Sequence, residues 1–100
     1  MHARTKAVAI MPKVREAVEK RDGHKCIFCG SSEARGEAHY INRSQGGLGI
    51  ESNIVTVCRK CHGEMDNGKN TKLYREIARD YLKSHYPDWD ESKLVYNKWR

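Results

Sequence analysis

The chain has 100 residues, four cysteines and a formal net charge of +6, with a pI near 9.3. A chain of this length has little apolar material for a self-sufficient core. We therefore expect a small domain that a structural metal helps to stabilise. No stretch is long and apolar enough to span a bilayer, and Met1–Pro12 lacks the apolar core of a signal peptide. We therefore expect a cytoplasmic protein without a membrane partner.

The positive charge is concentrated in the first part of the chain. Residues 1–62 carry eleven Lys and Arg against six Asp and Glu, whereas residues 63–100 carry eight against seven. This imbalance favours a polyanionic partner for the first part, such as nucleic acid. A lysine-rich solvated surface explains the charge alone equally well.

The N-terminal 22 residues predict a flexible lead-in and a helix. Residues 1–11 are basic and show no regular pattern. Pro12 suits the first position of a helix, and Gly23 stands where a helix should end. We expect a helix over 12–22, supported by the helical spacing of Val14, Ala17, Val18 and Arg21.

The middle of the chain predicts a strand, a long loop, a second strand and a helix. Glu37–Asn42 is a candidate short strand, and the next segment, 43–52, contains three glycines and is expected to be a mobile loop. Asn53–Cys58 is rich in β-branched residues, as strands are. A helix should follow over 59–66 and end before Asn67-Gly68.

The C-terminal part predicts an amphipathic helix over Thr71–His85. Pro87 prevents its continuation, and Asp90 suits the cap of a last short helix in which Val95 and Trp99 stand four apart. We expect one apolar stripe on the long helix, made of Leu73, Ile77, Tyr81 and Leu82, with Tyr74, Ala78 and His85 beside it.

The aromatic residues of this region more plausibly pack the tail onto the domain than stack on bases. This interpretation covers Trp89, Trp99, Tyr74 and Tyr81. Three histidines are expected to have surface or packing roles, namely His2, His24 and His85.

The four cysteines form two Cys-x-x-Cys pairs, Cys26/Cys29 and Cys58/Cys61. In a secreted protein they would make two disulfides, but a reducing compartment favours metal binding. Two such pairs can supply the four thiolates of a tetrahedral structural Zn²⁺ site. The sequence thus predicts a small α+β fold in which 1–11 is a lead-in, 12–68 a zinc-stabilised core and 69–100 a helical extension packed on it.

Between and beside the cysteine pairs lie His39, Asn53 and His62, residue types suited to phosphodiester hydrolysis. That reaction needs a base to form the nucleophile and a cation to stabilise the leaving oxygen. His39 suits the base, because imidazole titrates near neutrality, and it would need an acceptor on its other nitrogen to fix the tautomer. Asn53 is expected to bind backbone and orient the loop or His39, or else to present its amide oxygen to a metal.

His62 suits a metal ligand at the start of a helix. Asp66 is four residues further on and shares its helix face, so the pair can hold a divalent ion and leave positions open for phosphate and water. Two other interpretations stay open. His62 could be a ligand or neighbour of the zinc, and Asp66 could simply end the helix.

The motifs together resemble the HNH endonucleases, the ββα-metal or His-Me finger group. The residues that carry the resemblance are Cys26-Ile27-Phe28-Cys29, the run from Ala38-His39-Tyr40 to Gly46-Gly47, Asn53, and Cys58-Arg59-Lys60-Cys61-His62. More narrowly, the chain is similar to the small HNH proteins of phages that infect Gram-positive bacteria.

This resemblance implies a ββα-metal motif that cuts or nicks DNA. His39 matches the general base, Asn53 the central asparagine and His62 a ligand of the catalytic ion, which is Mg²⁺, Mn²⁺ or another transition metal. The resemblance also suggests DNA processing or packaging in the host cytoplasm, beside a phage terminase.

The chain departs from the family at Ala38, where many members have an Asp or His that also binds the metal. Asp66 is the first candidate for the missing ligand and Glu37 the second. Glu37 is two residues from His39, so in a regular strand it shares the same face and could equally orient His39.

Arg43 and Arg59 flank the motif and are the expected phosphate contacts, with Lys60 as a further candidate. Such contacts hold the nucleic acid without reading its sequence, so we expect weak sequence preference. A non-catalytic zinc module that binds nucleic acid or protein is the main rival, favoured by Ala38. A rubredoxin-like iron carrier would use the cysteines but neither His39 nor His62.

Overall fold

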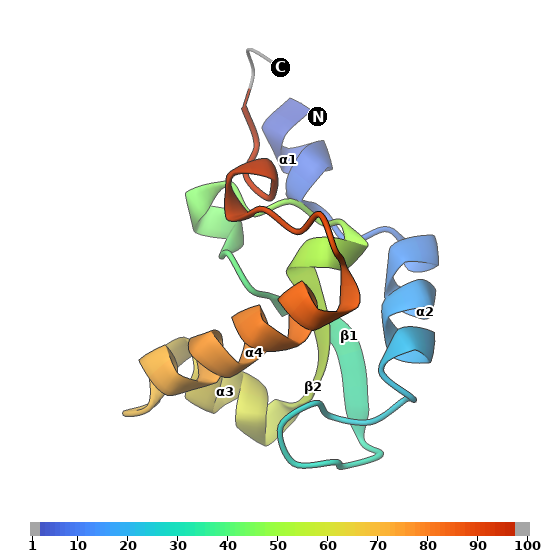
Figure 1. Cartoon of the computed structure of the whole chain (residues 1–100), viewed down its shortest axis with the longest axis vertical. Coiled ribbons are helices and arrows are strands. Elements are labelled where there is room, and N and C mark those ends of the chain that lie inside the picture. The colour runs from blue at the N-terminus through green and yellow to red at the C-terminus, as the bar shows by residue number, and fades with distance from the viewer. Residues whose placement is uncertain (1–2, 98–100) are drawn as a thin grey trace.

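The computed structural model describes residues 3–97 of the chain. It has a small α+β fold in which helices surround a two-stranded antiparallel sheet (Figure 1). The main elements, in chain order, are α1 (Ala3–Val8), α2 (Pro12–Arg21), β1 (Ala34–His39), β2 (Ile54–Cys58), α3 (Arg59–Asn67) and α4 (Thr71–His85). Short 3₁₀ turns occupy Arg43–Gln45, Glu51–Asn53 and Glu91–Lys93.

The two strands pair from Ala34 opposite Cys58 to His39 opposite Ile54. The register is irregular between Arg35 and Ala38, which is typical of a β-bulge. All five residues of β2 are buried, consistent with its β-branched composition. In Figure 1, α2 lies on one side of the sheet, and α3 and α4 lie on the other.

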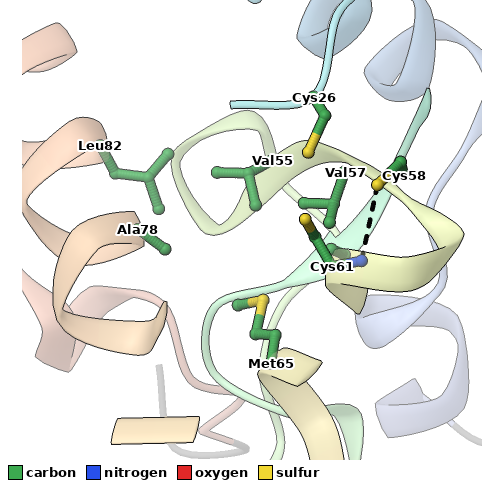
Figure 2. Packing of buried hydrophobic residues seen from close by; sticks show 9 residues of the cluster. Cys26, Val55, Val57, Cys58, Cys61, Met65, Ala78 and Leu82 are labelled. Carbon is green, nitrogen blue, oxygen red and sulfur yellow. Dashed lines mark hydrogen bonds between the residues drawn. The ribbon is translucent and has the colours of Figure 1, made fainter. Parts of the chain in front are cut away.

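The apolar core joins the sheet to the two C-terminal helices. Figure 2 shows Val55 of β2 on the side of Leu82 and Ala78 of α4, with Met65 of α3 below the strand. Val55, Met65, Ala78 and Leu82 are fully buried. Burying a side chain of the size of Val, Leu or Met contributes about 1.5–3 kcal/mol, so these contacts hold the helices against β2.

The face with which α4 packs differs from the predicted stripe. Leu82 is buried, but Leu73 and Ile77 are 54% and 43% exposed. The packed face runs through Tyr74, Ala78, Tyr81 and Leu82, so only Tyr81 and Leu82 of the predicted stripe lie on it. Apolar spacing alone favoured Leu73 and Ile77, whereas contacts with the sheet and with Phe28 determine which side of α4 is covered.

Three of the aromatic side chains considered, Tyr74, Tyr81 and Trp89, pack against the core, as expected. Tyr74 makes an edge-on contact with Phe28 at 4.7 Å between ring centroids. Trp89 lies 5.7 Å from the ring of Tyr40, and its indole N–H donates to the Ser52 carbonyl at 2.8 Å. The two contacts of Trp89 tie the C-terminal tail to the loop between the strands.

The last predicted helix is one 3₁₀ turn. Asp90 caps it, since its carboxylate accepts from the Ser92 backbone N–H at 2.9 Å. Val95 then forms an isolated antiparallel bridge with Gly47 of the loop. The interpretations made for His2 and Trp99 concern positions outside the described residues. Within residues 3–97 no helix is long and apolar enough to cross a membrane.

The predicted flexible lead-in contains a helix and is docked on the loop. The amide of Gly49 donates to the Ala7 carbonyl at 3.0 Å, and Arg4 donates to the Ser44 carbonyl at 2.9 Å. A Cβ on Gly49 would lie 2.0 Å from the Ala9 carbonyl oxygen, so only glycine allows this close approach. The contacts are made to residues some forty positions away, and local sequence patterns carry no sign of them.

A buried ion pair connects α2, β2 and α4. Arg21 donates two hydrogen bonds to the Asp22 carboxylate, at 2.7 and 3.0 Å. That carboxylate also accepts from the Tyr81 hydroxyl at 2.6 Å and from the Thr56 amide at 2.9 Å. Burial alone would raise the pKa of Asp22, but these hydrogen bonds outweigh burial and lower it.

Candidate metal centre and adjoining pocket

The sulfur atoms of the four cysteines lie together, all within 4.8 Å of one another. The distance between the Cys29 and Cys58 sulfurs is 3.6 Å, too long for a disulfide bond of about 2.05 Å. Tetrahedral zinc with Zn–S bonds of about 2.3 Å places its sulfur ligands about 3.8 Å apart. The cluster formed by Cys26, Cys29, Cys58 and Cys61 could therefore hold a metal ion such as zinc.

Local backbone geometry presents the sulfurs of both pairs. After Cys29, Gly30 turns the chain with a φ of +79°, and its amide donates to the Cys26 carbonyl at 2.9 Å. Cys58 precedes α3 and caps it, because its sulfur accepts from the Cys61 amide at 3.5 Å (Figure 2). The second pair thus fixes the start of the helix that carries His62.

The pKa values of the cysteine thiols are shifted by burial and by their neighbours in the cluster. Burial raises the pKa of the Cys61 thiol, and the neighbouring sulfurs raise it further. In Cys26, burial is outweighed by hydrogen bonds from the backbone, which lower the pKa to about 7. Thiolates packed this closely oppose one another's ionisation, and a bound cation removes that opposition.

A pocket of about 690 Å³ collects several of the predicted chemical residues. It is bounded by the end of β1, the loop after it and the outer face of α3. The residues that line it include His39, His62, Asp66, Glu37, Arg43 and Arg15. The two histidines singled out from the sequence therefore face one space.

His39 is the last residue of β1, and its ring is held by the N-terminal segment. Its Nε2 lies 2.9 Å from the Val8 carbonyl oxygen. A carbonyl only accepts, so Nε2 must donate, and in the neutral ring Nδ1 keeps a free lone pair. The Val8 carbonyl is thus the acceptor that a neutral base requires.

The pKa of His39 is lowered from its usual 6.5. Burial is the main cause, because it disfavours the charged ring, and the positive charge of Arg43 acts in the same direction. The ring is consequently neutral at pH 7, the state in which it can accept a proton.

His62 and Asp66 occupy successive turns on one face of α3. Their Nε2 and Oδ2 atoms are 3.2 Å apart, and both side chains are about 40% exposed. Adjacent ligands of an octahedral ion at about 2.1 Å lie about 3.0 Å apart, so the pair fits the first two positions around a divalent cation. In residues 3–97 the four cysteines are the only group of three or more clustered ligand atoms, so most positions of such an ion would stay open.

Asn53 lies away from the pocket and is fully buried. Its Oδ1 accepts from the Ile41 amide at 2.9 Å, and its Nδ2 donates to the carbonyls of Ile41 and Leu48 at 3.2 and 2.9 Å. Of the two roles considered, the geometry matches the backbone-bonding one. Asn53 holds the loop that follows His39, and its amide oxygen is directed at backbone.

Glu37 lines the pocket, as His39 does, but it is exposed and paired with Arg15 at 3.0 Å. Ala38 is buried in the apolar core and presents no ligand atom. Of the two candidates, Asp66 is therefore the carboxylate that contacts His62, whereas Glu37 is paired with Arg15.

The three basic residues predicted to contact phosphate fall in different places. Arg43 is exposed and lines the pocket. Arg59 lines a neighbouring groove of about 630 Å³, which shares Glu37 and His62 with the pocket. Lys60 is exposed on α3 and lines neither of them.

Sequence reasoning missed two contributors to the site, the Val8 carbonyl and Arg75. A backbone carbonyl carries no residue-type signal. Arg75 lies in α4, nine residues after Asp66, and its guanidinium donates to the Asp66 Oδ1 at 3.0 Å. An isolated arginine on an amphipathic helix resembles any solvated charge, so no pattern identified it.

Comparison of the chain with protein-family models, curated proteins and solved structures gives no significant match.

Proposed function

We propose that this protein is a metal-dependent DNA endonuclease of the HNH type. The observation that carries the proposal is that one pocket contains a neutral histidine with a free Nδ1 and, on α3, a His–Asp pair with ligand-like spacing. The motif resemblance assigns the same residues to the same roles. The basic charge of the first 62 residues supports an anionic substrate.

The core corresponds to a ββα-metal motif in this proposal. β1 carries the base, β2 leads into the second cysteine pair, and α3 carries the metal pair. Structural zinc in the cysteine cluster would fix the start of α3, and with it the position of His62 relative to His39. The zinc has no part in the reaction itself.

His39 is the general base. Its Nδ1 accepts a proton from a water molecule whose oxygen forms a bond to phosphorus, and the P–O bond to the departing strand end breaks. The Val8 carbonyl holds the proton on Nε2 throughout, so that Nδ1 remains the accepting atom. A divalent cation held by His62 and Asp66 would supply positive charge that stabilises the departing oxygen. Arg43 at the pocket edge attracts and holds the phosphate.

The replacement His39→Ala tests this proposal. General-base catalysis contributes about 100- to 10,000-fold, so nicking of supercoiled plasmid in Mg²⁺ or Mn²⁺ should slow by that factor. Zinc content, measured by atomic emission, should stay equal to that of the wild type. His24→Ala is the matched control, because His24 is exposed and lies outside the pocket. Undiminished nicking by His39→Ala at normal zinc content would refute the assignment of the base.

A second candidate function is a non-catalytic zinc module that binds nucleic acid or a protein. Ala38 favours it, because position 38 offers no ligand to a catalytic ion. Purified wild-type protein that binds DNA but cuts nothing in Mg²⁺, Mn²⁺, Ni²⁺ or Co²⁺ would establish this alternative and exclude the nuclease.

A further inference from the structure

Arg75 makes a dense set of contacts beneath the pocket. One guanidinium nitrogen, Nη2, donates to Asp66 Oδ1 at 3.0 Å and to Asn42 Oδ1 at 2.7 Å. The other, Nη1, donates to the carbonyl oxygen of His39 at 3.3 Å and to that of Tyr40. The side chain is 21% exposed, so much of it is shielded from solvent.

These contacts link the two halves of the proposed active site. His39 ends β1, and Asp66 lies near the end of α3, whereas Arg75 comes from α4 and touches both. The guanidinium is planar and presents its donors in a fixed geometry, so it holds its acceptors at set spacings. Lysine at this position would keep the charge but could not reproduce that geometry.

The contacts also distinguish the two oxygens of Asp66. Oδ1 faces Arg75, and Oδ2 faces His62 Nε2 at 3.2 Å. Without Arg75 the carboxylate would keep only its contact with His62, and it is about two-fifths exposed, so either oxygen could turn toward the histidine. Arg75 therefore fixes which oxygen is presented on the His62 side.

We propose that Arg75 is a positioning residue of the divalent-ion site, which orients Asp66 toward His62 and fixes the spacing between that pair and His39. This inference rests on the proposed function and extends it, because it makes the C-terminal helix a working part of the active site. Arg75 acts through Asp66 and the backbone of His39 and does not itself contact the substrate.

Binding of Mn²⁺ to zinc-loaded protein tests the inference without any turnover. Free Mn²⁺ can be measured by electron paramagnetic resonance as the protein is titrated. Loss of a residue that orients a metal ligand typically costs about 10- to 100-fold in metal affinity or activity. We expect Mn²⁺ binding to weaken by that factor in both Arg75→Lys and Arg75→Gln, while zinc content is unchanged.

Arg79→Gln is the matched control. Arg79 lies one turn further along α4, pairs with Asp80 at 3.2 Å and lines no part of the pocket. The Arg79→Gln variant should bind Mn²⁺ as the wild type does. Thermal melts of each variant check the fold, and Arg75→Lys is the variant that best preserves it, because charge and length are nearly kept.

A double-mutant comparison separates positioning from a general packing role. If Arg75 acts through Asp66, Arg75→Lys should weaken Mn²⁺ binding much less in an Asp66→Asn background than in the wild type. Equal losses in both backgrounds, or wild-type Mn²⁺ affinity in Arg75→Lys, overturn this inference alone. Wild-type protein that neither binds Mn²⁺ nor cuts DNA overturns the proposed function together with it.

Discussion

At the scale of single residues, the proposed chemistry depends on the protonation state of one imidazole. His39 is only 8% exposed, and its Nε2 donates to the Val8 carbonyl oxygen at 2.9 Å. The hydrogen bond fixes the tautomer, and burial lowers the pKa of the ring below 6.5. The hydrogen bond by itself would raise the pKa, but burial outweighs it and keeps Nδ1 free over the pH range in which most histidines begin to carry charge.

The pH dependence of cleavage should show this shift. In the proposed mechanism neutral His39 is the active form, and its pKa is lowered, so activity should persist below pH 6.5 and fall only as pH drops through the lowered pKa. The logarithm of kcat/KM plotted against pH reports the base of the free enzyme. An acidic limb with its midpoint at or above 6.5 contradicts the prediction.

At the scale of elements, the features that depend on local signals were predicted from the sequence, and those that depend on tertiary contacts were not. The helix predicted over Thr71–His85 is observed with the same bounds, and the other predicted helices and strands are found with shifted ends, except the last helix, which is a single 3₁₀ turn. Capping residues, helix breakers and β-branched runs act locally, so sequence reveals them. The six-residue helix Ala3–Val8 and the packed face of α4 depend on distant partners, and those partners cannot be deduced from spacing.

The same division applies to the candidate site. The cysteine pairs, His39 and the His62–Asp66 spacing are visible in the sequence, because their residue types and intervals reflect chemistry. The Val8 carbonyl and Arg75 become part of the site only through folding, since each lies on an element outside the motif.

The substitution Gly49→Ala should displace the N-terminal segment from the loop on which it is docked. The new Cβ would lie 2.0 Å from the Ala9 carbonyl oxygen, so the backbone around Ala9 must move, and the Val8 carbonyl with it. A misplacement of about 1 Å can cost roughly 100-fold in rate, so we expect nicking to fall at least tenfold at normal zinc content.

Gly63→Ala is the control for this substitution. Its Cβ would meet nothing within 4 Å, and in the α3 interior alanine is favoured over glycine by about 1 kcal/mol. Its melting temperature should therefore rise slightly. If Gly49→Ala cuts DNA at the wild-type rate, docking of the N-terminal segment is not needed to orient His39.

At the scale of the whole molecule, the cysteine cluster joins parts that are distant in the chain. Cys26 follows α2, and Cys58 and Cys61 span the junction of β2 with α3. The apolar core packs directly against these cysteines, and it is small. The fold should consequently depend on the metal more than on the core.

Removal of zinc should therefore unfold the protein. Structural zinc in finger-like peptides contributes about 10–16 kcal/mol of apparent binding free energy at neutral pH, whereas whole domains are stable by only about 5–15 kcal/mol. We expect Cys61→Ser, or strong chelation of the wild type, to abolish the cooperative melt seen by circular dichroism. The zinc should be removed more easily at low pH, because protons compete with zinc for the thiolates. A native-like melt after chelation would show that the buried Arg21–Asp22 pair and the core suffice without metal.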